Sequence, residues 1–141
     1  MSENDLRIMK LLIELESDGA FASLRDAELV RTIWSEDLVV VVVRATSASF
    51  SDLAKLSRKL GEALGKKVRV VESTRDFKKV FAETLSPVPV VGVNLLWLPD
   101  GTVQYIVRIS RGDERLLPAS RRSLEEVLSE IVRGQVQIKA E

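Results

Sequence analysis

The stretch VVVRATSASFSDLAKLSRKL, residues 41–60, decides the fold because a short polar loop in it joins a buried strand to a basic helix. The valine-rich run 38–44 predicts a strand that is buried on both faces. Apolar residues at helical spacing predict a helix over 52–64, and Gly65 is typical of the residue that caps one. The loop contains no glycine, histidine or cysteine. It is therefore neither a phosphate-binding loop nor a catalytic loop of the common kinds.

The elements expected around this stretch form a small unit. A stripe of apolar residues predicts a helix over 5–16. Alternating or β-branched residues predict strands over 28–34 and 66–73. The first half of the chain is thus expected to run helix, strand, strand, helix, strand.

The second half repeats this order. A helix is expected over 74–85, with Thr74 as its N-cap, and another over 121–133, which Gly134 closes. The expected strands are 90–98 and 102–110, joined by the turn 99–101, and 135–139.

The repeat predicts the fold class. Gly65 and Gly134 close corresponding helices and lie 69 residues apart. A repeat of this length, which contains a whole supersecondary unit, is not expected by chance. We expect an α/β (α+β) protein of two small tandem units, residues 1–73 and 74–141, each a three-stranded sheet covered by helices.

Composition excludes several classes of site. The chain has 141 residues and contains neither cysteine nor histidine. Disulfides, zinc sites of the usual ligands and catalytic groups that need His or Cys are therefore excluded. An all-carboxylate metal site stays open, but no cofactor and no enzymatic activity are expected. The formal net charge is zero, so affinity for nucleic acid requires local clusters of cations.

The sequence also predicts the compartment. The longest apolar run, 38–43, is too short to span a bilayer. The N-terminal segment carries acidic residues before its apolar ones, unlike a signal peptide. We expect a cytoplasmic protein without membrane contact.

Three segments resemble archaeal NusA-like proteins, which consist of tandem type II KH domains. They are LRDAEL at 24–29, which follows Gly19 and Ala20, LGKKVRVVESTRD at 64–76, and FAETLSPVPVVGVNL at 81–95. The resemblance covers nearly the whole chain. It implies a KH fold and a factor in transcription elongation or termination. The implied partners are single-stranded RNA and RNA polymerase.

The loops at which KH domains grip RNA are degenerate. A Gly-x-x-Gly loop lets phosphates approach the main chain closely. The corresponding positions here are 49–52 and 118–121, and neither contains glycine. The alternative is therefore a protein-interaction module that keeps the KH fold and binds no RNA.

Two clusters of cations are the candidate RNA-binding sites. Residues 55–69 contain six cations and one acid, and residues 108–122 contain five cations and two acids. One interpretation is that the lysines and arginines of these clusters contact phosphates. The competing interpretation is that they form a solvated helix face. The candidate residues are Lys55, Arg58, Lys59, Lys66 and Lys67 in the first cluster and Arg111, Arg115, Arg121 and Arg122 in the second.

Three aromatic residues are candidates for stacking on bases. Trp34, Trp97 and Tyr105 all fall in expected strands. Exposed rings stack bases in single-stranded complexes. An aromatic residue in a strand more often belongs to the core or covers a sheet, and we expect this of all three.

Overall fold

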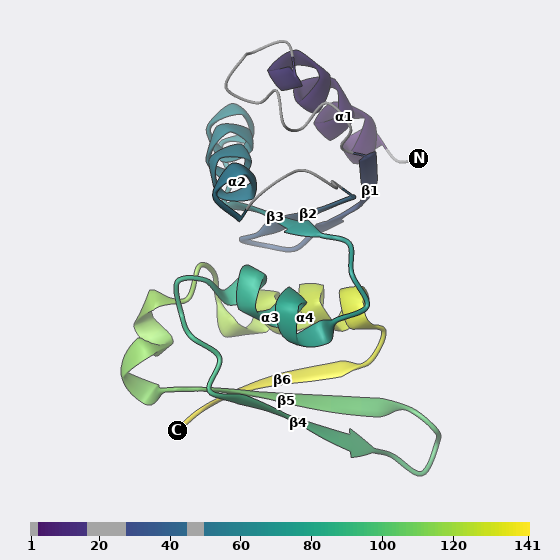
Figure 1. Cartoon of the computed structure of the whole chain (residues 1–141), viewed down its shortest axis with the longest axis vertical. Coiled ribbons are helices and arrows are strands. Elements are labelled where there is room, and N and C mark those ends of the chain that lie inside the picture. The colour runs from purple at the N-terminus through teal and green to yellow at the C-terminus, as the bar shows by residue number, and fades with distance from the viewer. Residues whose placement is uncertain (1–2, 17–27, 45–49) are drawn as a thin grey trace. The chain divides into compact units, whose positions relative to one another are not determined.

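The chain forms a mixed α/β fold that divides into two compact units. The structure is a computed structural model that describes residues 3–16, 28–44 and 50–141. The first unit comprises Met1–Trp34 and Val39–Ser73, and the second comprises Ser35–Leu38 and Thr74–Glu141. Each unit contains a three-stranded sheet and helices, as expected (Figure 1).

The described part of the first unit contains two helices and three strands. They are α1 (Glu3–Glu16), β1 (Glu28–Trp34), β2 (Val39–Arg44), α2 (Phe50–Leu64) and β3 (Val68–Glu72). The central strand β2 pairs antiparallel with β1 and parallel with β3. Figure 1 shows α1 and α2 on the same face of this sheet.

The core of the first unit lies between that face and the two helices. Ile8 of α1 and Leu56 and Leu60 of α2 pack with Val41 and Val43 of β2, and all five are buried. Residues 39, 41 and 43 share one face because side chains alternate along a strand. The intervening valines of β2 are buried as well, as the unbroken valine run predicts.

The second unit repeats the arrangement. Its elements are α3 (Phe77–Leu85), β4 (Gly92–Trp97), β5 (Val103–Ile109), the short 3₁₀ helix η2 (Arg111–Leu116), α4 (Arg121–Val132) and β6 (Gln135–Ala140). The central strand β5 pairs antiparallel with β4 and parallel with β6. η2 lies between the predicted strand 102–110 and the predicted helix 121–133, where the sequence predicts no helix.

Aromatic rings join helix and sheet in the second core. The centroid of the Tyr105 ring lies 5.3 Å from that of Phe77 and 5.8 Å from that of Phe81. Both ring planes are inclined to the Tyr105 ring, which is the arrangement that aromatic quadrupoles favour. Tyr105 therefore covers the sheet, as expected.

The start of α3 differs from the prediction. Thr74 was expected as the N-cap, but Asp76 caps the helix. The Asp76 carboxylate accepts hydrogen bonds from the backbone N–H groups of Lys78 at 3.1 Å and Lys79 at 3.4 Å. The Thr74 hydroxyl instead accepts a hydrogen bond from the Asp76 N–H at 3.1 Å. Thr74 therefore holds Asp76 in place and does not bond to the helix itself.

The end of α4 corrects a second expectation. Gly65 adopts a left-handed conformation, with φ of 67°, and so caps α2 as expected. At α4 the left-handed residue is Arg133, with φ of 55°, and not Gly134. Gly134 lies so close to β5 that a Cβ there would stand 2.7 Å from the Val103 carbonyl oxygen. The glycine is required by the neighbouring strand rather than by the cap.

Across the described ranges, no helix is both long and apolar enough to cross a membrane.

Candidate functional site

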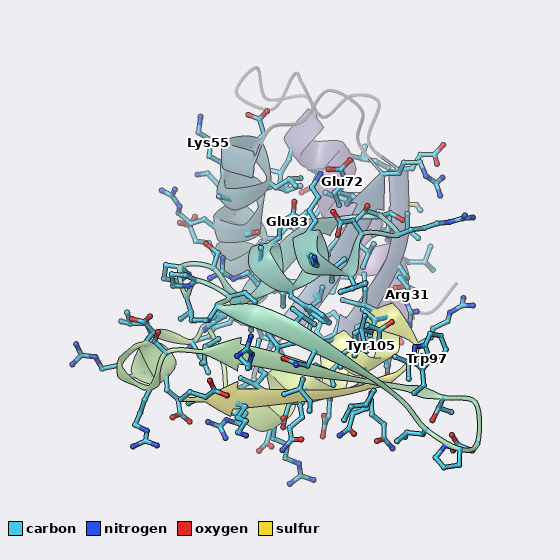
Figure 2. All side chains as sticks on the ribbon, turned by 60° about the horizontal axis from the view of Figure 1, so that its bottom comes forward. Arg31, Lys55, Glu72, Glu83, Trp97 and Tyr105 are labelled. Carbon is cyan, nitrogen blue, oxygen red and sulfur yellow. The ribbon has the colours of Figure 1, made fainter. Side chains whose placement is uncertain are left out.

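The α2 helix divides into an apolar side and a cationic side. Leu53, Leu56 and Leu60 are buried in the first core. Lys55, Arg58 and Lys59 are exposed, because they occupy the intervening positions of a helix with 3.6 residues per turn. Figure 2 shows Lys55 projecting outward from α2. Lys66 and Lys67, exposed between α2 and β3, continue the charge. These five cations are called the α2 basic face below.

Few acidic groups offset this face. The Lys59 Nζ lies 3.9 Å from a Glu62 carboxylate oxygen, and both side chains are more than half exposed. An exposed pair of this kind holds its partners weakly. Among the described residues, Lys55 and Arg58 form no ion pair. Most of the charge on the face is thus available to an anionic ligand.

Trp34 supports one lysine of the face. The Lys66 Nζ lies 5.6 Å from the centroid of the Trp34 ring, a cation–π contact. The indole N–H of Trp34 donates a hydrogen bond to Thr32 Oγ1 at 3.2 Å, and the ring packs against the first core. Trp34 therefore orients Lys66 and belongs to the core, as expected of an aromatic residue in a strand.

Arg69 lies apart from the face. It is a residue of β3 and is about half buried. Burial lowers the pKa of its guanidinium because the charged form loses hydration. Its charge contributes to the cluster in sequence but less to the exposed surface.

A buried serine fixes α2 to the sheet. The Ser57 hydroxyl donates to the Leu53 carbonyl oxygen at 2.9 Å and accepts from the Val70 N–H at 2.8 Å. The position of the basic face relative to β3 is therefore set by a hydrogen bond as well as by leucine packing. Helical periodicity places Ser57 on the side of Leu53 and Leu60, four residues after the first and three before the second, but it does not reveal the bond to β3.

The second cluster of cations is partly paired with acids. Arg121 pairs with Glu114, and the Arg122 Nε lies 3.4 Å from a Glu126 carboxylate oxygen. Arg111 and Arg115 are exposed on η2. The structure thus brings acids to two of the four predicted residues, which leaves this cluster less able to bind phosphate.

The helix that follows the second degenerate loop is capped by a serine of that loop. Ser120 is the N-cap of α4, and its hydroxyl accepts a hydrogen bond from the Ser123 N–H at 3.2 Å. A phosphate at this helix end would compete with that hydroxyl for the free N–H groups. At the first degenerate loop, residues 45–49 lie outside the described part of the chain. Phe50–Asp52 form the first turn of α2.

Trp97 differs from the expectation for an aromatic residue in a strand. Its side chain is 77% exposed, and it lies on β4 close to the hairpin turn (Figure 2). Leu95 and Leu96 are also exposed, at 43% and 47%. The only signal in the sequence is the uncharged run 90–98, which is equally typical of a buried strand.

The turn that follows β4 is closed by one carboxylate. Asp100 accepts hydrogen bonds from the Thr102 hydroxyl at 2.6 Å and the Thr102 N–H at 3.0 Å. These two bonds hold the pKa of the exposed Asp100 carboxyl below its ordinary value. The hairpin predicted at 99–101 is thus confirmed.

The described residues contain no group of three or more acidic side chains placed to hold a metal ion. Ion pairs such as Arg44–Glu28, Lys59–Glu62 and Arg122–Glu126 lie at the surface. The arrangement can bind an anionic polymer or a protein.

No protein-family model matches the chain, and no curated protein matches its sequence. Among solved structures, the chain is similar to the protein described as "Crystal structure of APE1850", with a TM-score of 0.65 and 19% sequence identity. The match covers 99% of this chain and 100% of that chain. At this identity the similarity is one of fold, and it extends over both units.

Proposed function

We propose that this protein is a NusA-like, KH-fold factor of transcription elongation or termination that binds single-stranded RNA weakly. The observation that carries the proposal is the α2 basic face, with exposed cations on a helix that is fixed to its sheet. RNA polymerase is the expected protein partner, through the resemblance to archaeal NusA-like proteins.

The element order supports the KH part of the proposal. Apart from η2, the described elements of each unit run helix, strand, strand, helix, strand, the order that the sequence predicts for both halves of the chain. The basic helix α2 follows the degenerate loop of the first unit. A ligand of this unit would therefore meet the cations of α2 beside the position that the family uses for its clamp.

Binding would depend on side chains rather than on the main chain. Without glycine in the loop, phosphates cannot approach the backbone as they do in a glycine clamp. Lysine and arginine side chains then supply the contacts. Such contacts depend on salt and carry little sequence information. Affinity is expected to be low and similar across RNA sequences.

A charge-matched pair of variants tests the proposal. Lys55→Ala with Arg58→Ala removes two exposed cations, and alanine favours the helix. Lys78→Ala with Lys139→Ala removes the same charge from exposed positions of the second unit, outside both clusters. Fluorescence anisotropy with a labelled RNA oligomer should show weaker binding for the first variant. The slope of log affinity against log salt should flatten by about 1.4, or about 0.7 per contact.

The control variant should retain wild-type affinity. Equal losses in the two double variants would show only a response to net charge, and the α2 basic face would not be the binding site. Circular dichroism spectra establish that both variants are folded.

The second loop favours the alternative function, a protein-interaction module. Ser120 caps α4, and Arg121 and Arg122 each lie beside an acid, so a phosphate at this loop would compete with groups that are already bound there. If the wild-type protein binds no RNA at low ionic strength, this alternative replaces the RNA proposal.

A further inference from the structure

The edge strands of the two sheets differ in how they are protected from pairing with another chain. A strand at a sheet edge presents unpaired N–H and C=O groups that can pair with another chain. Proteins prevent this with charged side chains, bulges or covering elements. Within the described part of the chain, β1 and β3 are the edges of the first sheet, and β4 and β6 those of the second.

The β1 edge carries two protective features. The register of its pairing with β2 shifts between Leu29 and Arg31, which indicates a bulge. The strand also contains charged residues, and the exposed Glu28 pairs with Arg44 at 2.9 Å. Another strand could not lie flat along this edge without separating charged groups from water.

Helix side chains occupy backbone groups of β3 and β6. The Val70 N–H of β3 donates to Ser57 of α2 at 2.8 Å, and the Ile138 N–H of β6 donates to Glu125 of α4 at 2.8 Å. The Val136 N–H of β6 donates in the same way to Ser129 at 3.0 Å. Both strands also contain charged residues.

Between Gly92 and Trp97 the β4 edge has none of these features. Its sequence, GVNLLW, contains no charge and no proline, and its register with β5 is unbroken from Gly92 to Trp97. Leu95, Leu96 and Trp97 are exposed at 43%, 47% and 77%. An uncharged, regular and apolar edge is typical of a strand that pairs with another strand.

The hydrogen-bond ladder between β4 and β5 shows which backbone groups of β4 face the open edge. The Leu98 N–H donates to the Thr102 carbonyl oxygen at 2.8 Å. Hydrogen-bonded and non-hydrogen-bonded pairs alternate along an antiparallel ladder. Leu96 and Asn94 therefore also bond to β5, and the backbone groups of Val93, Leu95 and Trp97 face the open edge.

We propose that β4 pairs antiparallel with β4 of a second copy of this chain, which joins two three-stranded sheets into one across a two-fold axis at Leu95. In this register Leu95 faces Leu95, and Val93 faces Trp97 of the second copy. All three free backbone positions are then used. Each Val93–Trp97 contact pairs a β-branched residue with an aromatic one, a combination that stabilises paired strands.

The chemistry of β4 favours its own copy over another protein. A foreign peptide added to a sheet edge is selected by pockets for its alternate side chains. The strand offers no charge to a foreign partner, and two uncharged copies meet without repulsion. The contact is small compared with stable interfaces, which bury about 1,200–2,000 Å². The dimer is accordingly weak, with a dissociation constant of roughly 10–100 µM.

Sedimentation velocity over a concentration series tests the dimer. The wild-type protein should pass from monomer to dimer over the micromolar range. Leu95→Lys places two like charges opposite each other at the axis and should raise the dissociation constant by at least about tenfold. Val30→Lys is the matched control, since Val30 of β1 is 40% exposed against 43% for Leu95. It should dimerise like the wild type.

Cysteine variants test the register, because the chain contains no cysteine. Leu95→Cys brings two thiols together at a hydrogen-bonded pair, whose Cα atoms lie about 5.5 Å apart. This separation lies within the range of Cα distances that a disulfide spans. Mild oxidation should therefore give a covalent dimer of twice the 15.7 kDa chain mass. The Leu96→Cys variant, whose Cα atoms would be about 7–8 Å apart, should crosslink slowly, as should Val30→Cys.

Several results would overturn the proposal. A protein that remains monomeric to several hundred micromolar contradicts it, as does a dimer that Leu95→Lys leaves intact. Faster crosslinking through Leu96→Cys than through Leu95→Cys contradicts the register at Leu95. A different protein or peptide bound stoichiometrically along β4 contradicts the choice of partner. The RNA affinity of Leu95→Lys should equal that of the wild type, so the two proposals fail independently.

Discussion

Two glycines that look alike in the sequence have different roles in the structure. Gly65 has φ of 67°, and no atom lies within 4 Å of the place that a Cβ would take there, so its role is conformational. Gly134 has no left-handed φ, but a Cβ on it would stand 2.9 Å from the Tyr105 ring and 2.7 Å from the Val103 carbonyl oxygen. A glycine near a helix end can therefore be required by its own backbone angles or by a strand that is distant in sequence.

The first prediction concerns the Gly134→Ala substitution. The added methyl group meets backbone, which cannot move aside as a flexible side chain can. We expect the free energy of unfolding to fall by about 1–3 kcal/mol, as for other overpacked sites. Urea denaturation measures this change.

Gly112→Ala is the control for Gly134→Ala. Gly112 has no left-handed φ and no atom within 4 Å of the added carbon, so its substitution should change stability by less than about 0.5 kcal/mol. Equal stability of the two variants would show that β5 leaves room at Gly134.

At the scale of elements, each unit ties its strand to its helix in the same way. A side chain of α2 accepts a hydrogen bond from β3, and a side chain of α4 accepts one from β6. In both cases donor and acceptor are 13 residues apart. The acceptor is Ser57 in one unit and Glu125 in the other, so the geometry repeats while the residue type differs.

The second prediction is that Ser57→Ala destabilises the first unit. The Val70 N–H is buried and would lose its acceptor, which costs about 1–3 kcal/mol. Urea denaturation measures the loss, and hydrogen exchange at the Val70 amide should become faster. Ser110→Ala is the control, because Ser110 is exposed and makes no side-chain capping bond. An unchanged exchange rate at Val70 would contradict the assigned hydrogen bond.

Local sequence patterns predict some helices and strands more completely than others. β1 spans the seven residues 28–34, as predicted, because β-branched residues and a tryptophan fill much of this run. The start of α3 lies at Phe77 because Asp76 competes with Thr74 for the cap, and spacing alone does not rank the two. The exposure of β4 was not predictable, since its uncharged sequence is the same whether or not a fourth strand lies beside it.

For the whole molecule, zero net charge conceals an uneven surface. The α2 basic face is exposed and its Lys59 lies near Glu62, whereas Arg121 and Arg122 of the second cluster both lie beside acids. The sequence identified all nine candidate cations but not this difference. Ion pairing between Arg121 and Glu114 depends on how η2 folds against α4, which the spacing of charges does not reveal.

The third prediction follows from this difference between the clusters. Arg121→Ala with Arg122→Ala removes cations that acids already partly offset. It should therefore weaken RNA binding less than Lys55→Ala with Arg58→Ala does. Anisotropy titrations at one low salt concentration compare the two. A larger loss for the arginine pair would assign RNA binding to the second unit.

The most direct test of the central claim is the affinity of the wild-type protein for single-stranded RNA as a function of salt. If the five cations of the α2 basic face contact phosphates, log affinity should fall linearly with log salt, with a slope of roughly 2–3.5 in magnitude. The slope should be the same for RNA oligomers of different sequence. No binding at low ionic strength, or binding that does not vary with salt, would contradict the account.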